Sequence, residues 1–133
     1  MTGEEKYAYW LELAQYDLGS ADAMYNSGRW FYVVFMCQQA VEKLCKGLYN
    51  FHIDDNVPKI HNIGFLLSKI ETELAITIPA ETYNLADALS AYYLNTRYPD
   101  FAGRPGLQVN EETAKNFLQK TKEVYTWLLT LKQ

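Results

Sequence analysis

The chain has 133 residues, 12 basic and 16 acidic side chains, a net charge of −4 and a pI of about 5.1. This length favours a single domain over residues 1–133, and the 49% hydrophobic content excludes a disordered chain. The acidic balance excludes the broad basic surface of a non-specific DNA-binding protein, although a few cations can still form a local basic cleft. We therefore expect one globular domain that does not bind DNA.

The predicted location is cytoplasmic, without membrane association. The first six residues are acidic rather than basic, and the most apolar run, residues 30–37, is far shorter than the ~20 residues that span a bilayer. Cys37 and Cys45 lie in one predicted helix, about 12 Å apart along its axis, whereas a disulfide needs Cα atoms within about 7 Å. We therefore expect two buried, reduced thiols.

Apolar residues recur at helical spacing in five stretches, and none shows the clean alternation of a strand. The first predicted helix stops at Asn-Ser-Gly, residues 26–28, which is a typical C-terminal signal. The second covers residues 30–51 and is broken by the acidic, proline-containing segment 54–58. These two stretches predict a pair of long antiparallel helices at the start of the chain.

Three shorter helices are predicted to follow. The third starts near His61, and the fourth follows Pro79 and stops by Arg97 or Tyr98, because Pro99 disfavours helical geometry in its predecessor. Beyond a loop over residues 99–109, a capping Asn and two acidic residues open the fifth helix, which is predicted to end in Lys132. The predicted fold is an all-α, up-and-down bundle of four to five helices.

The residue spacing excludes several kinds of site. No Glu has a His three residues later, as di-iron bundles require, and the two His and two Cys residues do not fall at zinc-finger spacing. The chain also has no phosphate-binding glycine motif and no nucleophile elbow. We therefore expect no metal and no other cofactor, and we assign His52 and His61 to helix ends or loop hydrogen bonds.

One polar cluster lies in the second helix. Gln38, Glu42 and Lys46 stand at positions i, i+4 and i+8, which places them in one line on the helix surface; we call them the polar column. Spacing alone favours an exposed column with a Glu42–Lys46 ion pair worth about 0.3–0.5 kcal/mol. The alternative is that the column faces another polar element, because apolar residues surround it in sequence.

A second polar cluster closes the fourth helix with Tyr93, Arg97, Tyr98 and Asp100. A guanidinium beside tyrosines can form paired hydrogen bonds to a phosphate while the aromatic rings stack on a base. A cation at a helix C-terminus is also favourable simply through the helix dipole. The residues by themselves leave both interpretations open.

Taken together and in this order, the two clusters resemble the HEPN family, small helical domains named for nucleotide binding in higher eukaryotes and prokaryotes. The resemblance covers essentially the whole chain and is most specific at Gln-Gln-Ala-Val-Glu-Lys (38–43) and Arg-Tyr-Pro-Asp (97–100). It implies a helical bundle that dimerises and places its polar motifs along a cleft.

Many members of the family are metal-independent ribonuclease toxins that use an Arg followed four to six residues later by a His. Others pair with a minimal nucleotidyltransferase as a toxin–antitoxin couple, and in some couples the partner adenylylates a Tyr near the Arg. In this chain, four, five or six residues after Arg97 are followed by Ala102, Gly103 or Arg104, and none of these is His. We therefore expect binding without catalysis.

The resemblance predicts a prokaryotic homodimer that binds a nucleotide or RNA phosphate through Arg97, with Tyr93 or Tyr98 stacking and Asp100 orienting the Arg. The polar column would line the same cleft, and a nucleotidyltransferase would be the protein partner. Two alternatives stay open. One is a degenerate ribonuclease toxin with Arg97 and Asp100 as catalytic residues, and the other is a non-catalytic dimerisation or interaction module.

Overall fold

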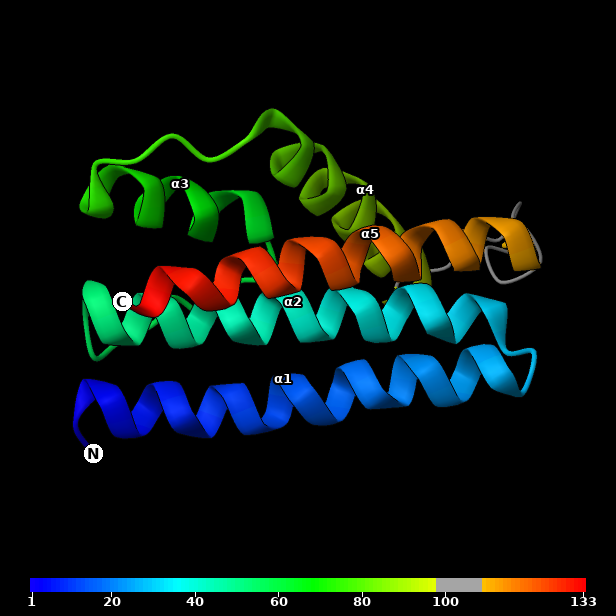
Figure 1. Cartoon of the computed structure of the whole chain (residues 1–133), viewed down its shortest axis with the longest axis horizontal. Helices are drawn as coiled ribbons and strands as arrows, with labels where there is room; N and C mark the ends of the chain where they lie inside the picture. The colour runs from blue at the N-terminus through cyan, green and yellow to red at the C-terminus, as the bar shows by residue number, and fades with distance from the viewer. Residues whose placement is uncertain (98–108) are drawn as a thin grey trace.

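The computed structural model contains five α-helices and a short 3-10 helix (Figure 1): α1 (Gly3–Asn26), α2 (Trp30–His52), α3 (Ile63–Leu74), α4 (Ala80–Arg97), α5 (Glu111–Leu129) and η2 (Thr130–Lys132). It describes the backbone of residues 1–97 and 109–133, and the side chains of residues 1–92 and 109–133. The predicted all-α bundle is confirmed, and the predicted helix ends agree closely with those observed. The fifth helix ends at Leu129 and passes into η2, earlier than predicted.

The two long helices α1 and α2 lie antiparallel along the length of the molecule (Figure 1). Their tight turn depends on Gly28, whose φ of +73° is in the left-handed region that favours glycine. The Gly28 amide donates to the carbonyl of Tyr25 (3.1 Å), and the Arg29 amide donates to that of Met24 (2.8 Å). This pattern closes the end of α1 and reverses the chain within three residues.

Helix α2 is the central element and packs against α1, α3, α4, α5 and η2. Thirteen of its 23 residues are buried, so apolar contacts surround the helix instead of following a single stripe. Helix α1 approaches α2 closely at Gly47, where an added Cβ atom would lie 3.1 Å from Cβ of Trp10 and 3.3 Å from Cδ2 of Tyr7. The absence of a side chain at Gly47 therefore permits the close approach of α1 and α2 at this point.

Both cysteines are buried in the core and free, as predicted. Burial raises the pKa of the Cys37 thiol to about 12. Burial also raises the pKa of Cys45, and the nearby carboxylate of Glu42 adds to that effect. Both thiols are therefore protonated at neutral pH.

The three shorter helices cover the rest of α2. Asn62, and not His61, caps α3 by accepting a hydrogen bond from the Phe65 amide (3.1 Å), and Asn110 caps α5 by accepting one from the Thr113 amide (2.8 Å). The two ends of the chain lie at the same end of the bundle (Figure 1), where the Lys132 ammonium is 3.4 Å from the Glu4 carboxylate. None of the described helices is long and apolar enough to cross a membrane.

Candidate functional site

The polar column of α2 is buried, so its expected exposure to solvent is wrong. The exposed fractions are 0% for Gln38, 3% for Glu42 and 9% for Lys46. The helix spacing was correct, but α2 is covered on this side as well by neighbouring segments. The interpretation in which the column faces another polar element is therefore the one that the structure supports.

The carboxylate of Glu42 is the centre of a hydrogen-bonded network. Nε2 of Gln38 donates to Oε1 (2.8 Å), and Nζ of Lys46 donates to Oε2 (2.9 Å). Gln39 extends the network by donating from Nε2 to the side-chain oxygen of Gln38 (2.9 Å). A buried carboxylate is tolerated when donors surround it in this way, because unpaired burial of a charge is very unfavourable.

His61 closes this network from the loop before α3. Its Nδ1 lies 3.2 Å from both carboxylate oxygens of Glu42. Because an ionised carboxylate only accepts hydrogen bonds, Nδ1 is the protonated ring nitrogen in this contact. The His61 side chain is 48% exposed, so the imidazole joins the buried carboxylate to the protein surface. Sequence spacing could not predict this pair, since the two residues are 19 positions apart.

A second branch of polar contacts links Lys46 to α1. Its ammonium lies 5.6 Å from the centre of the Trp10 ring, within the range of a cation–π contact. The indole Nε1 of Trp10 donates to Oδ1 of Asn50 (2.8 Å), and the Asn50 amide donates to the carbonyls of Asp54 (2.9 Å) and Asp55 (3.0 Å). The branch thus connects the centre of α2 to the loop that follows it.

An ion pair between Asp17 and Lys43 gives a third polar connection between α1 and α2. The Lys43 ammonium lies 2.5 Å from Oδ2 of Asp17, which is buried. Lys43 belongs to the segment 38–43, where the HEPN resemblance is most specific, and Asp17 lies on the facing side of α1. This motif residue of α2 is therefore paired with α1 inside the bundle.

The second predicted cluster lies at the C-terminal end of α4. The helix ends at Arg97, as expected from Pro99. Tyr98 and Asp100 lie outside the described residues, as does the predicted loop up to residue 108, and the side chains of Tyr93 and Arg97 are likewise outside them. The roles predicted for these four residues stay predictions.

Metal binding has no support within the described residues. In residues 1–92 and 109–133, no three His, Cys, Asp or Glu side chains come together in a group that could hold a metal ion. His52 instead donates from Nε2 to the carbonyl of Leu131 (2.7 Å), which fastens η2 to the end of α2.

The sequence of this five-helix bundle matches the HEPN domain family over residues 7–131. The chain belongs to the HEPN family. The match includes α1 to α5 almost completely, together with the network around Glu42 and the predicted cluster at Arg97.

Two solved structures are similar to this HEPN domain over nearly their whole length. The protein TT1696 from Thermus thermophilus has a TM-score of 0.83 and 26% identity, covering 95% of this chain and 98% of that one. ST0689, described as an archaeal HEPN homologue, has a TM-score of 0.76 and 26% identity, covering 96% and 98% respectively. No curated relative matches the chain.

Proposed function

We propose that this HEPN domain binds a nucleotide or an RNA phosphate through Arg97 at the C-terminal end of α4. In this proposal Tyr93 or Tyr98 stacks on the base, and Asp100 orients the guanidinium. Arginine suits this role because its planar donor groups form paired hydrogen bonds with phosphate oxygens. The observation that carries the proposal is the family match over residues 7–131, which includes all four residues.

The network around Glu42 takes a supporting role in this proposal. Gln38, Glu42 and Lys46 are buried and bonded to one another, so we assign them to positioning the cleft and not to direct contact with a ligand. Helix α2, which carries them, packs against α4, which carries Arg97. His61 is the member of the network with the greatest access to solvent.

The proposal favours binding over cleavage. Cleavage of RNA by its own 2′-hydroxyl needs a general base, and no His stands at the family spacing after Arg97. Asp100 would be a weak substitute, because an unperturbed Asp has a pKa of about 3.9 and its charge repels phosphate. The alternative of a non-catalytic interaction module is also disfavoured if Gln38 and Glu42 are to contact the partner. Both side chains are buried within one protomer.

The proposed biological setting is a two-component, toxin–antitoxin-like module. The HEPN domain would form a homodimer and bind a minimal nucleotidyltransferase. Gel filtration with light scattering tests the dimer, and co-purification with a nucleotidyltransferase encoded beside it tests the partner. A monomer that does not bind that protein would contradict this part of the proposal.

Isothermal titration with AMP, GTP and a short single-stranded RNA tests the binding function. We expect saturable binding that Arg97→Ala weakens at least about tenfold, since a charge-assisted hydrogen-bond pair is lost. Arg29→Ala is the matched control, because Arg29 is exposed at the turn between α1 and α2 and its side chain makes no capping bond. Equal affinity of Arg97→Ala and wild type, or no binding of any probe, would overturn the proposal.

A further inference from the structure

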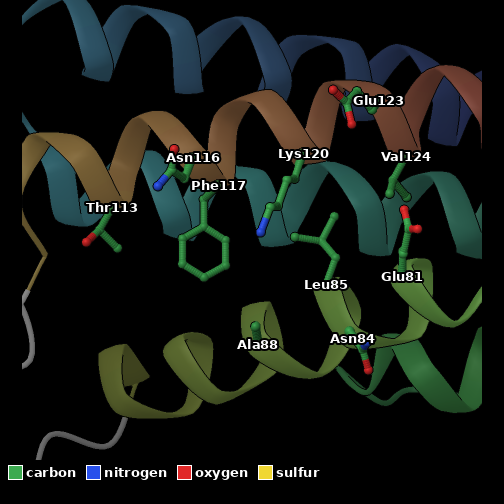
Figure 2. Close-up of a pocket in the computed structure, with 10 residues that line it drawn as sticks. All are labelled: Glu81, Asn84, Leu85, Ala88, Thr113, Asn116, Phe117, Lys120, Glu123 and Val124. Atoms are coloured by element: carbon green, nitrogen blue, oxygen red, sulfur yellow. The ribbon is translucent and has the colours of Figure 1, made fainter.

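A groove of about 530 Å³ lies between α4 and α5 (Figure 2), and none of its lining residues belongs to the buried network around Glu42. Its volume is within the range of about 300–1,000 Å³ that small-molecule sites usually occupy. The sequence did not point to this groove, because its residues come from two helices, and even the nearest of them across the groove, Ala88 and Thr113, are 25 positions apart in the chain.

The middle of the groove is apolar and contains one aromatic ring. Leu85 and Ala88 of α4 face Phe117 of α5, whose ring projects into the space between the two helices (Figure 2). Tyr92 packs against Phe117 with ring centres 5.2 Å apart and an interplanar angle of 75°. This edge-to-face contact restrains the Phe117 ring, which makes it a suitable surface for stacking a flat ligand.

A single ammonium group extends into the same space. Lys120 follows Phe117 by one helical turn, and its side chain points from α5 toward α4 (Figure 2). Among the described residues no carboxylate lies within ion-pair distance of Lys120, whereas Lys122 on the same helix pairs with Asp22 at 2.6 Å. An unpaired cation beside an apolar surface attracts an anion more strongly than one that is fully surrounded by water.

The polar groups at the two ends of the groove limit what can bind. Thr113 and Asn116 lie beyond Phe117 at one end and offer hydrogen-bond donors and acceptors, whereas Glu81 and Glu123 line the opposite end (Figure 2). With one ammonium and two carboxylates, the groove has a net charge of −1, from +1 − 2. This net charge disfavours a polyanion such as an RNA strand, and it restricts a single anionic group to the part of the groove beside Lys120, away from Glu81 and Glu123.

From these contacts we infer that the groove binds a small aromatic molecule that carries one anionic group. The ring stacks on Phe117 with its polar edge toward Asn116 and Thr113, and the anionic group pairs with Lys120. A carboxylate and a phosphate share this chemistry. The inference is independent of the proposed nucleotide site at Arg97, since none of the residues involved is shared.

Isothermal titration with four probes tests the inference. Indole-3-acetate presents a ring with a carboxylate, AMP presents a ring with a phosphate, and tryptamine presents the indole ring with a positive charge. Inorganic phosphate tests whether the anion alone is sufficient. We expect saturable binding of indole-3-acetate, AMP or both, and at least about tenfold weaker binding of tryptamine and inorganic phosphate.

Two variants within the groove and one control outside it locate the binding. Lys120→Met keeps the length of the side chain but removes its charge, and should weaken binding of the aromatic anion at least about tenfold. Lys115→Met removes a charge from the same helix outside the groove and should leave the affinity unchanged within about twofold. Phe117→Leu should weaken binding while retaining an apolar side chain, with the thermal melting curve as the check on folding.

The outcomes separate this site from the one at Arg97. Binding that is lost in Lys120→Met and retained in Arg97→Ala supports the groove. AMP binding lost only in Arg97→Ala, with no binding of indole-3-acetate, overturns the groove and leaves the proposed function standing. Tighter binding of tryptamine than of indole-3-acetate also overturns the inference, because Glu81 and Glu123 would then dominate the site.

Discussion

Lys46 and Lys120 show two opposite environments for a lysine on a helix of the same bundle. Lys46 is 9% exposed and donates to a buried carboxylate four residues earlier, while its ammonium also approaches the Trp10 ring. Lys120 is exposed, and its ammonium extends into an open groove. The first lysine is part of a closed network, and the second has its charge available for a ligand.

The position of each helix explains the difference. α2 is covered by neighbours around its circumference, so a polar residue there must find its partners inside the protein. α4 and α5 each leave one face open, so polar residues on their facing sides keep their access to solvent. The same residue types are therefore structural on the central helix and available for binding on the outer ones.

The largest expected effect concerns the centre of the closed network. Glu42→Ala leaves Lys46 with a buried unpaired charge and should lower the free energy of unfolding by about 3–5 kcal/mol. Glu123→Ala removes a carboxylate that lines the groove and should change it by no more than about 0.5 kcal/mol. Urea denaturation of both variants measures the contrast, and similar losses in the two would show that the environments do not differ.

Alkaline pH should destabilise the interior through the two buried thiols. Their pKa values are raised in the folded protein, to about 12 for Cys37, so unfolded chains lose these protons at lower pH than folded ones. The stabilisation is therefore complete below about pH 9 and is lost as the pH rises toward 12. At pH 10 we expect roughly 1 kcal/mol of lost stability per thiol.

Denaturation at pH 8 and pH 10 checks this expectation for the thiols. The double variant Cys37→Ala, Cys45→Ala is less stable at both pH values because it loses buried volume. Because it lacks the buried thiols, its free energy of unfolding should fall less between pH 8 and pH 10 than that of the wild type. A wild-type protein equally stable at both pH values would contradict the prediction.

A smaller effect is expected where α1 and α2 approach closely. Gly47→Ala gains helix propensity but brings Cβ to 3.1 Å from Cβ of Trp10, so we expect a net loss of about 1 kcal/mol. Gly19→Ala on α1 meets no atom within 4 Å and should gain about 0.5–1 kcal/mol. Thermal melting separates the two, and stabilisation by both substitutions would show that the α1–α2 spacing can adjust.

Most of the fold could be predicted from local sequence. Asn110 caps α5 where the sequence indicates, Gly28 closes α1, and α4 ends before Pro99. These signals act over a few residues and are independent of what packs nearby, so they can be interpreted without the tertiary structure. The roles of Arg97 and its neighbours also come from sequence alone and stay predictions.

The tertiary structure decided which polar side chains are buried and which residues they contact. The i, i+4 spacing of Gln38, Glu42 and Lys46 is the same on an exposed helix and on a central one, so the sequence determined the column but not its environment. His61 and Trp10 reach this column only because the loop before α3 and helix α1 fold onto α2. The groove at Lys120 likewise exists only because α4 and α5, separated along the chain, face each other in the folded protein.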